Sequence, residues 1–189
     1  MMRKLVVSVA LLSALVVMPR PAQAVIFLEV GDAGELLGAA QDVTGVGALT
    51  GISGSLGAAE TDLFHLFIAA GGGFSATTVG GAVFDTQLFL FDSSGFGVAA
   101  NDDTGGLGGL QSTLPAGHAL LIPLTAGDYF LGISQFNRDA VSAGGLIFPS
   151  SPFTGVFGPT GPGGGSPLSG WSGSPSTGGT YTIFLTGAE

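Results

Sequence analysis

Short apolar segments separated by glycine make up most of this chain, and several of them alternate strictly between two sets of side chains. In residues 61–71, TDLFHLFIAAG, every second residue from Asp62 to Ile68 falls on one face, and the residues between them fall on the other. A period of two is the period of a β-strand whose two faces meet different surroundings. The frequent glycines suit tight turns between such strands. The pattern therefore predicts an all-β protein.

Other segments also predict strands or turns. Strands are predicted over residues 73–81, 84–92, 96–100, 118–127, 127–136 and 179–187. Pro123 places the fourth of these at a sheet edge or a bulge, because proline has no N–H to donate to a ladder. Asp92-Ser93-Ser94-Gly95 has the composition of a β-turn and predicts a hairpin. Residues 31–43 are compatible with either a short helical turn or an extended lead-in.

Six to eight short strands without a long helix predict a single antiparallel β-sandwich of jelly-roll type. Residues 137–178 are rich in Gly, Pro and Ser and are predicted to form one long loop. This loop carries the aromatic residues Phe148, Phe153, Phe157 and Trp171. They are expected either to cover one sheet as a lid or to form a binding platform for a glycan or polypeptide.

The first residues have the organisation of an export signal. Arg3 and Lys4 precede an apolar run, and Ala22-Gln23-Ala24 has the small-x-small pattern of a cleavage site. We expect residues 1–24 to be removed and the mature domain to span residues 25–189. The protein is then secreted, to the periplasm or beyond the cell.

Cleavage leaves a strongly acidic chain. Arg138 is the only Lys or Arg after residue 24, and one base against thirteen acids gives a formal charge of −12. Such a chain is repelled by nucleic acid and by anionic lipid headgroups, so neither is an expected partner. The sequence has no cysteine, so no disulfide holds the loops and a bound metal is a candidate for that role.

A cluster of acids near the predicted strand ends is the strongest candidate site. Glu60 and Asp62 open one strand, Asn101 to Asp103 follow another, and Asp85 opens a third. Calcium binds six to eight oxygens, largely carboxylates and carbonyls. The predicted calcium ligands are Glu60, Asp62, Asp85, Asn101, Asp102 and Asp103. The alternative is that these residues are ordinary solvated turn and capping residues.

The order of segments resembles a known family. The runs ETDLFHLFIAAGG and FDTQLFLFDSSGFGVAANDD, followed by LTAGDYFLGIS and GTYTIFLTG, are similar to bacterial pre-peptidase C-terminal domains, in particular to secreted stand-alone forms. The resemblance covers most of residues 32–134 and 178–187. It implies a small non-catalytic β-sandwich, and several relatives of that family bind calcium. In this sequence the signal leads directly into the module, and the 137–178 loop is longer than the family pattern.

Catalysis is not expected. The two histidines, His65 and His118, lie in a predicted strand and a predicted turn, and there is no G-x-S-x-G motif and no thiol. The leading hypothesis is a secreted, calcium-binding, non-catalytic module with an adhesive, matrix or accessory role and an extracellular polymer or protein as partner. The alternatives are a carbohydrate-binding module that uses Trp171, Phe153 and Phe157, and a small secreted hydrolase.

Overall fold

The structure is a computed structural model, and it describes residues 24–106 and 109–189. Apart from Ala24, the predicted signal peptide lies outside the described residues. Within the described ranges, the 3-10 turns Leu37–Ala39 and Gly71–Gly73 accompany the strands. No helix in the described ranges has the length and apolar character needed to traverse a bilayer. The strands are β1 Val25–Leu28, β2 Gln41–Asp42, β3 Leu49–Ser55, β4 Thr61–Ile68, β5 Ser75–Thr77, β6 Thr86–Asp92, β7 Gly97–Asn101, β8 Thr113–Leu114, β9 Gly127–Gln135, β10 Asp139–Ser142, β11 Gly145–Leu146, β12 Val156–Phe157, β13 Gly170–Ser172 and β14 Thr180–Ala188.

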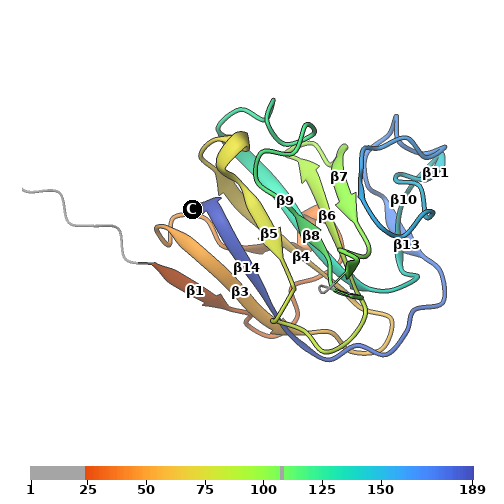
Figure 1. Cartoon of the computed structure of the whole chain (residues 1–189), viewed down its shortest axis with the longest axis horizontal. Coiled ribbons are helices and arrows are strands. Elements are labelled where there is room, and N and C mark those ends of the chain that lie inside the picture. Colours follow the sequence, from red (N-terminus) through yellow and green to blue (C-terminus); the bar gives the residue numbers. More distant parts are fainter. Residues whose placement is uncertain (1–23, 107–108) are drawn as a thin grey trace, which may run out of the picture.

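The strands form two facing layers, which confirms the predicted all-β sandwich (Figure 1). The first layer has the order β1-β3-β14-β5-β8, and the second has the order β2-β4-β9-β6-β7-β12. Most neighbouring strands are antiparallel, whereas β1 pairs with β3, and β2 with β4, in parallel. The hairpin predicted at Asp92 joins β6 to β7 in the second layer.

The end of β14 joins the two layers at one corner. Most of β14 pairs with β3 and β5, and its last strand residue, Ala188, pairs both with Leu49 of β3 and with Ile68 of β4. Gly187 makes the turn with φ +68°, a conformation that glycine adopts without strain. A Cβ at Gly187 would lie 2.8 Å from the carbonyl oxygen of Gly73, so a larger residue does not fit there.

Apolar side chains from both layers fill the space between them. The predicted alternation is confirmed, because one set of residues in each strand enters this core. The inward residues include Phe64 and Leu66 of β4, Leu88 and Leu90 of β6, Leu131 and Ile133 of β9, and Tyr181, Ile183 and Leu185 of β14. The other face of the second layer is also apolar, which requires a second covering element.

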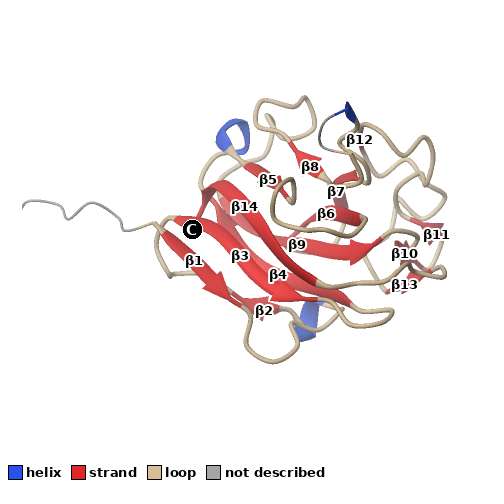
Figure 2. Cartoon of the chain, turned by 60° about the horizontal axis from the view of Figure 1, so that its bottom comes forward, coloured by secondary structure: helices blue, strands red, loops and turns tan. Residues whose placement is uncertain are grey.

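That covering element is a three-stranded sheet with the order β11-β10-β13, so the prediction of one long loop over residues 137–178 is wrong (Figure 2). Its strands have only two to four residues, in a segment rich in glycine and proline. They are too short to show the period-two alternation of side chains that predicts a strand. Ile147 and Phe148 beside it pack against Leu63, Phe89 and Phe91 in a second apolar cluster. We call residues 137–178 the insert.

Trp171 and Arg138 fasten the insert to the segment that follows β1. The Trp171 indole packs edge-on against Phe89 and Phe91, and its Nε1 donates a hydrogen bond of 2.7 Å to the carbonyl oxygen of Glu35. The guanidinium of Arg138 forms a 2.5 Å ion pair with the Glu35 carboxylate.

The strand predicted over residues 118–127 is wrong. The chain there forms successive turns, with Leu121 N–H donating to the carbonyl of His118 and Leu124 N–H to that of Leu121. Leu121 is fully buried, whereas the next residue, Ile122, is 59% exposed. The apolar residues 119–122 therefore form a loop that Leu121 holds against the core. Pro123 cannot donate to a ladder, which favours turns here.

Residues 31–43 contain both alternatives considered, a 3-10 turn and the short strand β2.

Replacing Phe91 tests the packing of the insert on the second layer. Phe91 is fully buried between Phe148 and Trp171, so Phe91→Ala is expected to reduce the free energy of unfolding by about 3–5 kcal/mol. Urea unfolding followed by Trp171 fluorescence measures the change. The control Phe96→Ala removes a phenyl ring that is 40% exposed and should cost about 0.5 kcal/mol or less. Equal losses in the two variants would contradict this packing.

Candidate metal centres

Four of the five acids predicted to bind one metal lie in two separate groups, and the fifth, Glu60, belongs to neither. In each group, three carboxylates bring oxygen atoms within 4.8 Å of one another. The Asp62 cluster consists of Glu29, Asp32 and Asp62, and the Asp102 cluster consists of Asp85, Asp102 and Asp103. The single site expected from the sequence is therefore divided in the structure. Glu29 and Asp32 were not among the predicted ligands.

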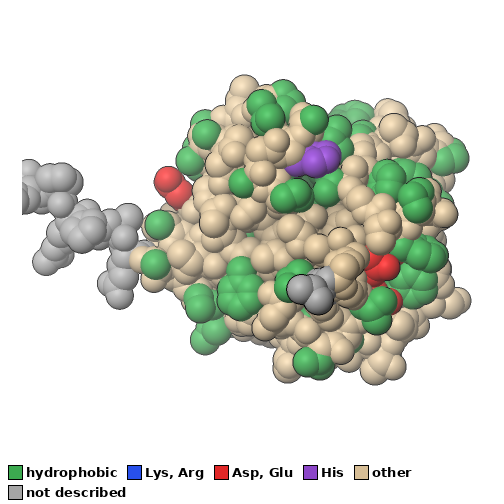
Figure 3. Space-filling view, in the orientation of Figure 1, with side chains coloured by type: hydrophobic (Ala, Val, Ile, Leu, Met, Phe, Trp, Pro, Cys, Tyr) green, Lys and Arg blue, Asp and Glu red, His purple; other side chains and the backbone are tan. Residues whose placement is uncertain are grey.

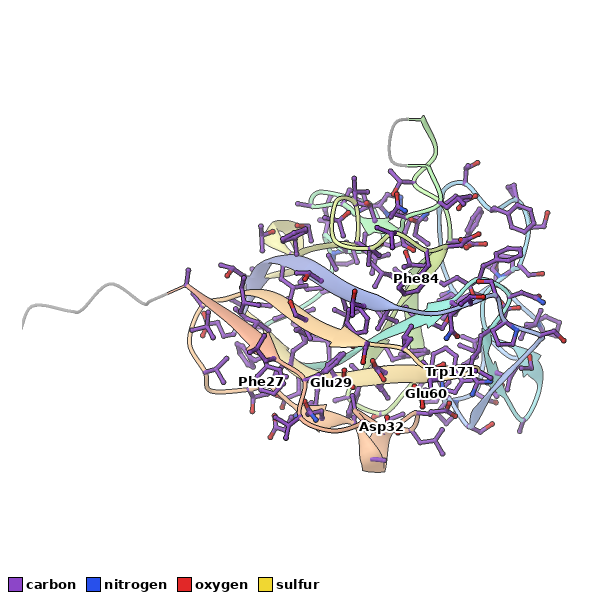
Figure 4. All side chains as sticks on the ribbon, turned by 90° about the horizontal axis from the view of Figure 1, so that it is seen from below. Phe27, Glu29, Asp32, Glu60, Phe84 and Trp171 are labelled. Atoms are coloured by element: carbon purple, nitrogen blue, oxygen red, sulfur yellow. The ribbon has the colours of Figure 1, made fainter. Side chains whose placement is uncertain are left out.

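Two segments distant in the sequence build the Asp62 cluster. Asp62 lies near the start of β4 and points into the sandwich, as its alternation with Leu63 requires. Glu29 follows β1, and Asp32 lies in the lead-in just beyond it. Figure 4 shows Glu29, Asp32 and Glu60 on the same side of the molecule. The cluster thus joins the edge of the first layer to the second layer.

Backbone N–H groups hold the carboxylates of Glu29 and Asp32 in place. Glu29 accepts hydrogen bonds from Ala33 N at 3.1 Å and Ser55 N at 2.9 Å. Asp32 accepts one from Gly34 N at 3.0 Å. These neutral donors orient the oxygens without cancelling their charge. No local sequence pattern marks either residue as a ligand, because the contact of Glu29 and Asp32 with Asp62 joins segments that are distant in the sequence.

Asp62 is the most buried acid of the two clusters, with 1% of its surface exposed. Burial and the nearby charges of Glu29, Asp32 and Glu60 together raise its pKa to about 7, against the lowering effect of a hydrogen bond from Tyr181. Its one hydrogen bond to a side chain comes from the Tyr181 hydroxyl, at 2.5 Å. Burial and the Asp62 carboxylate raise the pKa of Tyr181, so this hydroxyl stays protonated and donates. Glu60 lies apart and accepts from the backbone N–H of Gly57.

The Asp102 cluster lies at the opposite edge of the second layer, beneath the insert. Asp102 and Asp103 follow β7, and Asp85 directly precedes β6, the partner strand of β7. The N–H of Asp103 donates to the carbonyl of Phe153 at 3.1 Å, which ties the cluster to the insert. Asn101 does not point its amide into the cluster. Its Nδ2 donates to the carbonyls of Asp103 and Gly155, and its Oδ1 accepts from Thr113 N.

Two carboxylate oxygens of this cluster are buried without a partner. The Oδ1 atoms of Asp85 and Asp102 have almost no accessible surface and accept no hydrogen bond from any described residue. Burial, together with the charge of Asp103, raises the pKa of Asp102 to about 8 and that of Asp85 to about 6. Burial also raises the pKa of the neighbouring Asp139, whose carboxylate accepts from Gln87 Nε2 at 3.2 Å. Unpaired buried carboxylates are costly unless a proton or a cation compensates them.

No basic side chain among the described residues supplies that compensation. Arg138 is the only Lys or Arg after residue 24, and its guanidinium pairs with Glu35. His65 lies elsewhere, between Asp42 at 3.4 Å and Asp128 at 3.6 Å. Figure 3 shows one face of the molecule, and no Lys or Arg side chain is visible on it. Both clusters are thus arrays of oxygen donors that can take up a hard cation.

The predicted aromatic platform is not assembled as one surface. Phe148 and Trp171 pack inward against the second layer, as a lid would. Phe153 is 46% exposed and meets the ring of Phe136 edge-on at 5.4 Å. Phe157 is partly buried and lines an enclosed hollow beside Asp102 and Phe148. Phe153 and Phe157 are therefore brought near the Asp102 cluster, whereas Trp171 is held away by its bond to Glu35.

Comparison with known proteins does not assign this chain to a family. Neither family models nor curated proteins match this chain. The fold and the two acidic clusters define an all-β protein with candidate metal centres, and its function has to be argued from these sites.

The raised pKa of Asp102 predicts how the metal-free protein responds to pH. A folded pKa of about 8 lies above that of an unfolded carboxyl, ~3.9, so the folded state holds the proton more tightly. The stability that this gives is complete below about pH 4 and is lost as the pH rises through about 8. In EGTA, Asp102→Asn should therefore lose less stability than the wild type between pH 4 and 8, measured by urea unfolding. Equal slopes would contradict the raised pKa.

Proposed function

We propose that this protein is a secreted, non-catalytic β-sandwich module that binds calcium at the Asp62 and Asp102 clusters. The observation that carries the proposal is the convergence of three carboxylates at each cluster with no basic side chain to neutralise them. The buried position of Asp62 and the unpartnered oxygens of Asp85 and Asp102 support it.

Calcium is the cation that these donors favour. Each cluster offers carboxylate oxygens only, and zinc sites usually contain His or Cys, which neither cluster supplies. Calcium accepts irregular sets of oxygen ligands from loops, whereas magnesium requires a near-ideal octahedron. Both clusters take their carboxylates from segments that are distant in the sequence. Such irregular sets of ligands suit calcium better than magnesium.

Ion binding is expected to stabilise the fold. Each cluster places like charges together in partly or fully buried positions, and a divalent ion removes their repulsion. The Asp62 cluster joins the segment after β1 to β4, and the Asp102 cluster lies where the insert meets β6 and β7. In a chain without cysteine, these ions take the role that disulfides have in many secreted domains.

The wider role follows from the sequence. The resemblance to pre-peptidase C-terminal domains and the export signal favour a module that works outside the cytoplasm, as an adhesive, matrix or accessory component. The net charge of −12 disfavours nucleic acid and anionic membranes as partners. An extracellular polymer or protein is the proposed partner.

Thermal unfolding with and without calcium tests the proposal. Saturating calcium should raise the midpoint, and EGTA should reverse the change. At a free calcium concentration of about 100 times Kd, one site adds about 2.7 kcal/mol to the free energy of unfolding. Asp62→Asn and Asp102→Asn should each remove one site, and the double variant should show no calcium response.

A charge-matched control is Asp92→Asn. Asp92 accepts hydrogen bonds from Ser94 N and Phe96 N in its turn, and an asparagine oxygen can accept them too. This variant removes one negative charge outside both clusters and should keep the full calcium response. A midpoint unaffected by calcium in the wild type would refute the proposed function.

A further inference from the structure

A hollow opens beside the Asp102 cluster, between the second layer and the insert. Its lining includes Gln87, Asp102, Phe136, Asp139, Ser150 and Phe153. We call it the outer hollow. Asp102 also lines the enclosed hollow that reaches Phe148 and Phe157, and it shares both linings with Gln87, Asp139 and Ser150. The outer hollow therefore combines charged, hydrogen-bonding and apolar groups, as ligand sites do.

An ion held by the Asp102 cluster would keep free coordination positions. Three carboxylates supply between three and six oxygens, whereas calcium takes six to eight. The side-chain amide of Asn101 is committed to the backbone of Asp103, Gly155 and Thr113. Further ligands can come from Asp139, backbone carbonyls, water or a bound molecule that carries oxygen atoms. Asp102 lies on the wall of the outer hollow, so a molecule there would reach such an ion.

The aromatic residues of the outer hollow provide a surface for an apolar ring face. Phe153 is 46% exposed, although most large apolar side chains of the second layer and the insert are buried. Its ring is supported edge-on by Phe136, and its carbonyl is held by Asp103 N. An exposed aromatic ring fixed beside oxygen donors can pack against the C–H face of a sugar while the sugar hydroxyls reach the polar side.

The charge of the protein restricts which sugars can bind. The mature chain carries −12, and Asp139 adds a fourth carboxylate to the lining beside the cluster. An anionic polysaccharide would be repelled by this field, whereas a neutral one would not. Vicinal hydroxyl groups are neutral and can occupy two neighbouring positions on one calcium ion.

We infer that the outer hollow binds a neutral saccharide, whose vicinal hydroxyls complete the coordination of the ion at Asp85, Asp102 and Asp103 and whose ring face packs on Phe153. The inference rests on the proposed calcium binding at this cluster and adds the class of ligand. It also assigns separate tasks, since the carboxylates hold the ion and Phe153 contacts the sugar.

The test uses the full mature protein and the methyl glycosides of mannose, galactose and glucose. Saturation-transfer NMR and titration calorimetry measure sugar binding in saturating calcium and in EGTA, and calorimetry with calcium alone measures ion binding. Phe153→Ala and the bulk-preserving Phe153→Leu should keep calcium binding and weaken sugar binding about tenfold, the size of one lost aromatic contact. Asp102→Asn should lose sugar binding and one of the two calcium sites, while the Asp62 cluster still binds the ion. The control Phe184→Ala, which removes a ring that is 42% exposed on the first layer, should change neither.

The possible failures of the two proposals are distinguishable. If calcium binds at the Asp102 cluster but none of the three glycosides binds, the saccharide inference is overturned and the calcium function stands. Sugar binding that persists in EGTA or in Asp102→Asn overturns the role of the ion. If calcium does not bind at this cluster, both the function proposed for it and the saccharide inference fall.

Discussion

The burial of carboxylates without a basic partner is the constraint on which this structure depends. Asp62 is 1% exposed, and the Oδ1 atoms of Asp85 and Asp102 have no hydrogen-bond partner among the described residues. A folded chain meets this cost by keeping a proton or by binding a cation. The raised pKa values of Asp62 and Asp102 describe the first state, and calcium binding is the proposed second state. The proposed calcium binding therefore couples stability and pH response to ligand binding at the same side chains.

The sheets determine where these carboxylates lie. Antiparallel pairing of β6 with β7 brings the start of one strand beside the end of the other, so Asp85 meets Asp102 and Asp103. The insert then covers this edge, fixed by the bond from Asp103 N to Phe153 and by the contacts of Trp171 and Arg138 with Glu35. The only strong base of residues 24–189 is thus used to attach the insert, which leaves both acidic clusters without one.

Sequence patterns predicted most of the long strands, all three acids of the Asp102 cluster and, of the Asp62 cluster, Asp62 alone. The alternation in β4, β6, β9 and β14 was readable because one face enters the core and the other meets different surroundings. Strand β3, LTGISGS, was missed because its glycines break the alternation, and residues 118–127 were assigned as a strand although one buried leucine anchors a loop there. Asp62 was predicted to share a site with Asp102 because both lie near strand ends. The strand order shows that they lie apart, since β9 and β6 separate β4, which carries Asp62, from β7, which precedes Asp102. Glu29 joins Asp62 through the pairing of β1 with β3, a long-range contact without a local pattern.

Anomalous diffraction from crystals of the mature protein grown with terbium, a hard cation that substitutes for calcium, tests the central claim most directly. The account predicts two strong peaks, one within coordinating distance of Glu29, Asp32 and Asp62 and one within coordinating distance of Asp85, Asp102 and Asp103. Crystals that contain terbium in the solvent but show no peak at either cluster would contradict it.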